Sequence, residues 1–156
     1  MSGQKDNDKQ ISDEKEEAVL SPLNDEQKFR FEEDILAISK RIRLIRGNPL
    51  LIMYYPENMG RIVDEDIATV YEQFRRRGFS YTGKKIPELD VLLNTLGGSP
   101  DAAYMIAQSV RSFSSRVNFL IPFHAASAGA LLTFSGDKII FGACAHLTPI
   151  DVSLGY

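Results

Sequence analysis

Leu89–Pro100, with the sequence LDVLLNTLGGSP, decides the fold of this chain. Its first five residues are mostly apolar and predict a buried strand, and the glycine pair Gly97-Gly98 predicts a sharp turn close behind it. Ser99 suits the N-cap of a helix and Pro100 its first position. The stretch therefore predicts a strand, a tight turn and a helix in immediate succession.

The same order of elements recurs along the chain. A strand is expected over Val117–Pro122, and a small-residue turn at 125–127 opens a short helix expected over Ser127–Phe134. Alternation of this kind favours an α/β fold with a parallel sheet, in which ligands bind at the carboxyl ends of the strands. Both turns are expected at that edge. The other expected strands are Leu50–Tyr55 and Lys138–Phe141, and the other expected helices are Asn24–Arg46 and Val63–Arg77.

Composition indicates one compact domain without a strongly charged partner. The chain has 156 residues, is 44% hydrophobic and carries a formal net charge of −3. It contains no basic stripe with interleaved aromatic residues, so we expect no nucleic-acid binding. No stretch approaches the roughly 18 continuous apolar residues of a membrane span, so we expect no transmembrane segment and a cytoplasmic location. The lone Cys144 is expected to be a small buried side chain.

The chain divides by composition into three segments. Residues 1–22 are polar and charged and predict a disordered tail, residues 23–48 predict an N-terminal helix, and residues 49–156 predict the domain that carries the chemistry. The helix has one apolar stripe, which either packs on its own domain or forms an arm for a partner subunit. The stripe consists of Phe31, Ile35, Ile38, Ile42 and Ile45.

The two turns together suit acyl transfer. Ser127 offers a hydroxyl among small neighbours, and the N–H groups of Gly97 and Ala128 are candidate donors to a negative oxygen that develops beside it. Losing one such donor typically costs about 2.7 to 4 kcal/mol of transition-state stabilisation. In the alternative interpretation Ser127 only caps a buried helix, and Gly97-Gly98 only makes a tight turn. The spacing by itself leaves both interpretations open.

Three motifs in order give a resemblance to a known family. The sequence NTLGG at 94–98 resembles an "NTPGG" or "HTPGG" turn, ASAG at 126–129 resembles a nucleophile turn, and LTPIDVSLG at 147–155 resembles an "LGPVDPQLG" segment. These are motifs of the serine dehydrogenase proteinase family, which is related to signal peptide peptidase A within the Clp protease/crotonase superfamily. The resemblance extends from about Leu50 to Gly155.

This resemblance implies a Clp protease/crotonase-like α/β fold, a parallel sheet with ββα-type repeats. It also implies a serine peptidase that cleaves peptide bonds through a Ser127 acyl-enzyme, with the N–H groups of Gly97 and Ala128 as the oxyanion hole. A peptide or protein substrate and a homo-oligomer are implied, and no cofactor or metal is. Leu96 stands where the family has proline, which loosens the turn and keeps the glycine donor.

The general base is the part that the resemblance does not supply. Clp proteases have a histidine after the serine helix, but here the corresponding stretch runs through Thr148-Pro149. His124 and His146 are interpreted as ordinary loop or core histidines rather than as the base. Relatives of signal peptide peptidase A use a lysine that follows the serine. We expect that the domain is truncated and that its base lies beyond Tyr156.

Two other functions stay open. The acyl-CoA branch of the same fold uses two N–H donors on a thioester enolate and needs no serine nucleophile. The other function is that of a catalytically inactive scaffold or adaptor whose N-terminal helix recruits partners. Binding of acyl-CoA would favour the first of these, and loss of function on removing residues 1–48 but not on changing Ser127 would favour the second.

Overall fold

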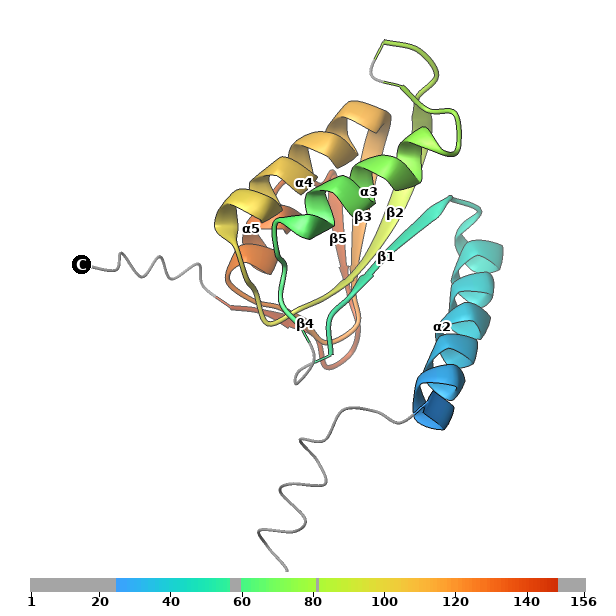
Figure 1. Ribbon diagram of the computed structural model, residues 1–156, viewed down its shortest axis with the longest axis vertical. Helices are drawn as coiled ribbons and strands as arrows, with labels where there is room; N and C mark the ends of the chain where they lie inside the picture. The colour runs from blue at the N-terminus through green and yellow to red at the C-terminus, as the bar shows by residue number, and fades with distance from the viewer. Residues whose placement is uncertain (1–24, 57–59, 81, 149–156) are drawn as a thin grey trace, which may run out of the picture. The chain divides into compact units, whose positions relative to one another are not determined.

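A computed structural model of the chain describes residues 25–56, 60–80 and 82–148, which form an α/β structure (Figure 1). Four parallel strands form the main sheet in the order β1-β2-β3-β5, and β4 and β6 form a small second parallel pair. The elements in chain order are α2 (Asp25–Arg46), β1 (Leu50–Tyr54), α3 (Glu65–Arg75), β2 (Ile86–Asn94), α4 (Pro100–Phe113), β3 (Ser114–Ile121), β4 (His124–Ala125), α5 (Ala128–Thr133), β5 (Lys138–Phe141) and β6 (His146–Leu147).

Helices α3, α4 and α5 pack on one face of the main sheet. The main-sheet strands follow one another in sequence order, and crossovers of a single hand then place every connecting helix on the same side. The apolar cluster on that face contains buried residues from all three helices and from the neighbouring strands. This architecture confirms the predicted α/β fold with a parallel sheet.

Strand register explains why that face is apolar. Leu51, Val91, Phe119 and Ile139 pair in one row across the four strands, and all four contribute to the helix-covered core. Above this layer the ring of Phe74 from α3 stacks on the ring of Phe113 from α4, with centroids 4.8 Å apart. Because strand side chains alternate between faces, Met53, Leu93, Val117 and Ile121, each two residues along its strand from that row, also point into the helix-covered core.

The opposite face of the sheet carries a buried polar group, which we call the Asp90 cluster (Arg46, Asn48, Asp90 and Asn118). Asp90 is fully buried in β2, and its carboxylate accepts two hydrogen bonds from Arg46, at 2.8 and 3.0 Å. Asn48 and Asn118 donate to the same carboxylate at 3.2 and 2.8 Å. The cluster fixes the last turn of α2 and the turn after it onto the middle of the sheet.

The predicted start of α4 is confirmed in detail. Ser99 is the N-cap, and its hydroxyl accepts the Ala102 N–H at 3.1 Å, while Pro100 occupies the first helical turn. Asp101 lies in the same turn, where the positive end of the helix dipole stabilises its negative charge. The strand, turn and helix predicted from Leu89–Pro100 are therefore all present.

The small sheet of β4 and β6 was not predicted. Two-residue strands are too short to show alternation of apolar and polar side chains, so no periodic pattern marks them. The main strands β2 and β3 are also longer than the expected Leu89–Leu93 and Val117–Pro122 segments. Among the extra residues at the amino ends, Glu88 and Arg116 are polar and pair with each other across the sheet, whereas Ile86 is buried in the core.

Helix α2 is confirmed between Asp25 and Arg46. The chain divides into two compact units, Met1–Ile38 and Ser39–Tyr156, and the boundary between them falls within this helix. The predicted tail at 1–22 and Asn24, the first residue of the expected helix, lie outside the described residues. Ile45 is 80% exposed, so this end of the apolar stripe does not pack on the described part of the chain, and an arm for a partner subunit stays a prediction. Among the helices in the described ranges, none is long and apolar enough to cross a membrane.

Candidate functional site

Pairing between two loops brings the glycine turn and the serine turn together. After β2 ends, the Thr95 N–H donates to the His124 carbonyl at 2.9 Å, and the Ala126 N–H donates to the Thr95 carbonyl at 3.0 Å. This parallel bridge aligns Thr95 with Ala125, two residues before each of the predicted site residues. The turns thus lie side by side at the carboxyl ends of the strands, as the order of elements predicted.

Gly97 lies directly against Ser127. A Cβ atom built on Gly97 would be 3.0 Å from the Cβ of Ser127 and 3.5 Å from its Oγ. Gly97 also has φ +114°, a conformation that side-chain-bearing residues rarely adopt. A larger residue at 97 would therefore occupy the space beside the serine hydroxyl.

Ser127 has a strained backbone. Its φ of 49° and ψ of −116° make it the one non-glycine residue with positive φ in the described part of the chain. Such strain costs on the order of 1 to 3 kcal/mol and gathers at functional sites, and a nucleophilic serine on a sharp turn between strand and helix is a known example. The Ser127 side chain makes no capping hydrogen bond to α5, so the simple capping interpretation does not account for it.

Gly129 allows α5 to start close to the glycine turn. A Cβ atom on Gly129 would overlap the Cγ2 methyl of Thr95, which lies against the first turn of the helix. Ala128 and Gly129 are both buried. The small residues of the ASAG motif therefore serve close packing of the serine turn on Thr95, whatever chemistry follows.

The N–H groups near Ser127 differ in how they are used. Ala128 begins α5, so its N–H has no acceptor within the helix. The Gly97 N–H, by contrast, donates to the Thr95 hydroxyl at 3.0 Å. Gly98 forms a parallel bridge with Ile62. In this bridge the Ile62 N–H donates to the Gly97 carbonyl at 2.9 Å, and the Ser99 N–H donates to the Ile62 carbonyl at 2.8 Å. The N–H of Gly98 itself points away from Ile62 and makes no hydrogen bond to any residue that the structure describes.

Two histidines lie on the strand pair that leads into Ser127. His124 in β4 and His146 in β6 are directly paired, and Nδ1 of His124 is 3.1 Å from Nε2 of His146. Just after this pair, the Ser127 N–H donates to the hydroxyl of Thr148 at 3.2 Å. The histidine pair is partly exposed and precedes the serine turn on both strands.

Three residues at this site were missed by sequence reasoning. The Thr95 hydroxyl accepts the Gly97 N–H, the Thr148 hydroxyl accepts the Ser127 N–H, and the Gly98 N–H has no partner among the described residues. Thr95 and Gly98 lie within the motif NTLGG, but nothing in a single sequence tells which of its backbone groups face the serine. Thr148 depends on the β4–β6 pair, which has no sequence pattern of its own.

Cys144 is exposed, so the expectation of a small buried side chain was wrong. It lies in the turn between β5 and β6, where the chain crosses the surface. Within the described ranges, no three His, Cys, Asp or Glu side chains are grouped in a way that could hold a metal ion.

Comparison with known proteins gives a limited picture. No protein-family model matches the chain. Over 67 residues the chain is 34% identical to an uncharacterized protein, MJ0137, of Methanocaldococcus jannaschii. That match covers 43% of this chain and 23% of the relative's length. Among solved structures, the chain is similar to a ClpP1 mutant from Listeria monocytogenes, with a TM-score of 0.46 and 17% identity, over 61% of this chain and 50% of that one.

Proposed function

We propose that the chain is a serine peptidase-like protein of the Clp/crotonase type that cleaves peptide bonds through an acyl-enzyme on Ser127. One observation carries the proposal: Ser127 is held at positive φ, between a strand and a helix, with its side chain uncommitted to capping. A serine that only shaped the turn would be replaced at lower conformational cost by glycine.

The proposed reaction has two steps. Ser127 Oγ loses its proton to a base and attacks the substrate carbonyl carbon, which places the negative charge on the carbonyl oxygen. When that intermediate collapses, the C–N bond breaks, the amine leaves with a proton, and the acyl group stays on Ser127 as an ester. Water then attacks the ester and releases the acid and the free hydroxyl.

The negative oxygen needs two converging donors, and the proposal takes them from the glycine turn and from Ala128. The Ala128 N–H at the start of α5 is one of them. On the glycine side, the Gly97 N–H would have to exchange its bond to Thr95 for a bond to the oxyanion, whereas the Gly98 N–H needs no exchange. Buried donors of this kind act at low dielectric, where each is worth more than in water.

A fluorophosphonate probe tests the nucleophile directly. We expect the purified chain to be labelled on Ser127, and the Ser127→Ala variant to be unlabelled with an unchanged circular dichroism spectrum. Ser135→Ala is the matched control, because Ser135 lies just beyond the end of α5 and its hydroxyl donates to the Leu132 carbonyl at 2.8 Å. Equal labelling of the chain and of Ser127→Ala, or no labelling of a folded chain, would contradict the proposal.

The same probe tests the base. If the histidine pair accepts the proton, His124→Ala and His146→Ala will each slow labelling at neutral pH, and raising the pH will restore much of the rate. If the base lies elsewhere, both variants will label at the rate of the unchanged chain. The pH profile of labelling distinguishes these results without a known substrate.

A further inference from the structure

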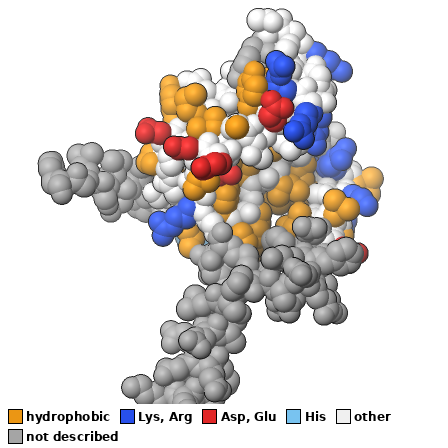
Figure 2. Space-filling view, in the orientation of Figure 1, with side chains coloured by type: hydrophobic (Ala, Val, Ile, Leu, Met, Phe, Trp, Pro, Cys, Tyr) orange, Lys and Arg blue, Asp and Glu red, His pale blue; other side chains and the backbone are white. Residues whose placement is uncertain are grey.

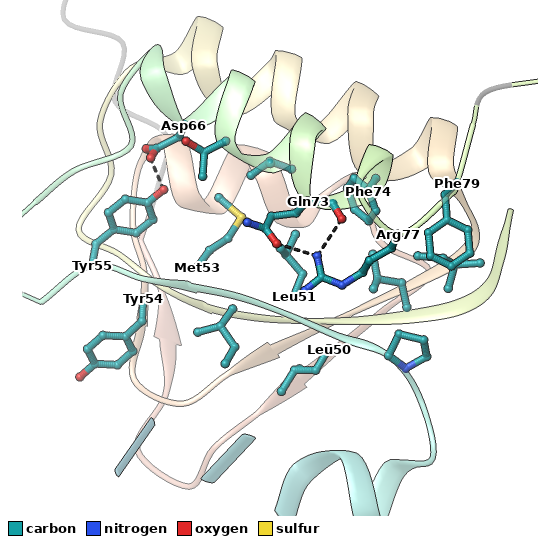
Figure 3. Close-up of a pocket in the computed structure, with 16 residues that line it drawn as sticks. Leu50, Leu51, Met53, Tyr54, Tyr55, Asp66, Gln73, Phe74, Arg77 and Phe79 are labelled. Atoms are coloured by element: carbon teal, nitrogen blue, oxygen red, sulfur yellow. Dashed lines mark hydrogen bonds between the residues drawn. The ribbon is translucent and has the colours of Figure 1, made fainter. Parts of the chain in front are cut away.

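A groove runs between β1 and α3, and no residue of the serine turn lines it. Its cavity of about 470 Å³ is lined by side chains from the two elements and from the loop after α3 (Figure 3). Leu51 and Met53 point up from β1, and Phe74 and Gln73 face them from α3. Strand β1 is the outermost strand of the sheet, so the groove is bounded by a sheet edge.

The outer edge of β1 offers backbone groups to a further strand. The Pro49 carbonyl accepts from Asp90, and the Tyr55 N–H donates to Asn94, so the odd-numbered residues here direct their backbone groups toward β2. Backbone direction alternates along a strand, and the N–H and carbonyl groups of Leu50 and Ile52 therefore point to the open edge. In the described part of the chain no strand pairs with that edge. An unpaired strand edge is a ready template for another chain.

The floor of the groove is apolar, and its two ends differ in charge. Met53, Val70 and Phe74 are buried beneath it. At the end where β1 finishes, the Tyr55 hydroxyl donates to Asp66 at 2.8 Å (Figure 3). Burial, together with this bond, raises the pKa of the Tyr55 phenol well above its usual value. Tyr55 therefore stays a neutral hydroxyl that donates to the Asp66 side chain.

The other end of the groove holds an oriented cation. Nη1 of Arg77 donates to the Gln73 carbonyl at 2.7 Å and to its side-chain oxygen at 2.6 Å, which folds the guanidinium back along the groove (Figure 3). No acidic side chain among the described residues pairs with Arg77. Further Lys and Arg side chains gather over the end of α3 and the following turn (Figure 2). This end therefore suits a carboxylate, with which the free face of a guanidinium forms paired hydrogen bonds.

We propose that the β1–α3 groove binds an extended peptide as an added strand, with a carboxylate of the peptide on Arg77. The backbone of the peptide bonds to Leu50 and Ile52, and alternate apolar side chains enter the groove, as in other cases of strand addition at a sheet edge. Arg77 lies where β1 begins, so a peptide with its carboxyl terminus at Arg77 runs antiparallel to β1. The site needs no catalysis and stands independently of the role proposed for Ser127.

The binding experiment uses a fluorescein-labelled hexapeptide of alternating valine and threonine with a free carboxyl terminus. Fluorescence anisotropy is measured against the purified chain, and the same peptide with an amidated terminus is the matched control. We expect the free acid to bind at least about fivefold more tightly, since a hydrogen bond between two charged groups strengthens binding even where solvent screens part of it. Equal binding of acid and amide, or no binding at millimolar protein, overturns the proposal.

Two variants assign the carboxylate contact. Arg77→Gln removes the charge but keeps a polar side chain at the end of α3, and we expect it to bind the acid and the amide equally. Arg75→Gln is the control, because Arg75 is on the same turn but lies over the Tyr71 ring. A preference for the acid that survives Arg77→Gln and is lost in Arg75→Gln would overturn the assignment.

Methylated peptides separate strand addition from simple side-chain docking. One peptide carries N-methyl groups on its valines and the other carries them on its threonines, so each lacks the N–H donors of one edge only. We expect one of them to bind at least tenfold more weakly than the other, because only one edge faces β1. Equal affinity of the two methylated peptides contradicts an added strand. Neither protein variant nor peptide alters Ser127, so probe labelling is expected to be unchanged throughout.

Discussion

The turn pair (Gly97-Gly98 and Ser127) and the Asp90 cluster are held in place by different means, although Gly97-Gly98 follows strand β2 and Asp90 lies within it. The turn pair depends on backbone conformation, since its residues have φ values of 114°, 143° and 49°. The Asp90 cluster depends on side chains, with one buried carboxylate that accepts bonds from Arg46, Asn48 and Asn118. The first contains no charged group and the second is ionic.

This difference predicts different sensitivities. A backbone in the positive-φ region tolerates few residue types but is indifferent to pH and salt. A buried ion pair depends on its charges, and it loses stability when one partner is removed or neutralised. The following substitutions separate the two kinds of constraint.

Gly98→Ala is expected to have the largest effect. A Cβ atom at 98 would fall within the backbone of Ile62, and the φ of 143° is unfavourable for alanine in addition. Because neither backbone segment can move without breaking the Ile62–Gly98 bridge, we expect a loss of more than about 3 kcal/mol in the free energy of unfolding, or failure to fold. Urea denaturation followed by circular dichroism measures it.

Gly60→Ala is the control for Gly98→Ala. Among the described residues, a Cβ atom at Gly60 would meet a ring carbon of Tyr55 alone, at an ordinary 3.6 Å. We expect its stability to stay within about 0.5 kcal/mol of the unchanged chain. Similar losses in both variants would show that the clash with Ile62 is not what limits position 98.

Asp90→Asn is expected to cost less, about 2 kcal/mol at pH 7, since Arg46 loses a charged partner but stays partly exposed. Burial raises the pKa of the Asp90 carboxyl, but the hydrogen bonds from Arg46, Asn118 and Asn48 outweigh it and hold the pKa below its usual value. A carboxyl with a lowered folded pKa contributes full stability above its unfolded pKa and loses it as pH falls through the folded pKa. Asp90→Asn will therefore flatten the decline in stability below about pH 4.

Glu88→Gln is the control for the decline in stability at low pH. Glu88 bonds to Arg116 at 2.9 Å on the exposed part of β2, and its bond from Asn118 does most to hold its pKa low. Because that pair is exposed, we expect a smaller loss at pH 7 than for Asp90→Asn. If the decline in stability at low pH flattens in Glu88→Gln but not in Asp90→Asn, the decline comes from Glu88 and the prediction for Asp90 is wrong. Stability measured by urea titration between pH 2.5 and 7 checks both.

Ser127→Gly is expected to have the smallest effect and the opposite sign. Glycine relieves the positive φ, which is worth about 1 to 3 kcal/mol, and loses part of this to the entropy of the unfolded chain. We expect a gain of about 1 kcal/mol over Ser127→Ala, which keeps the strain, together with complete loss of probe labelling in both. Thermal denaturation of the two variants measures the difference. A Ser127→Gly chain less stable than Ser127→Ala would mean that the turn is not strained.

Much of the fold was predictable from local patterns. Lys138–Phe141 was predicted as a strand with the bounds that the structure has, and the cap of α4 by Ser99 and Pro100 followed from residue type. Those features depend on neighbours in sequence. The exposure of Cys144 and of Ile45 was not predictable, because burial depends on which distant segment covers a residue.

The candidate site was predictable only as a set of residues. Sequence placed Gly97, Ser127 and Ala128 at one sheet edge, and the structure puts Gly97 in contact with Ser127. It did not predict that Thr95 would occupy the Gly97 N–H, because that bond needs the hydroxyl and the amide of one turn in a particular conformation. The catalytic roles of these residues stay a prediction until the probe experiment is made.

The sequence by itself determined the alternation of strands and helices, the parallel sheet and the two small-residue turns. These follow from hydrophobic periodicity and from the conformational range of glycine, proline and serine, which act over a few residues. Only the tertiary structure decided that Ser127 has positive φ, that His124 meets His146, and that β1 leaves a groove beside α3. Each of these depends on strand register and on packing between segments far apart in the chain, and such contacts have no pattern in a single sequence.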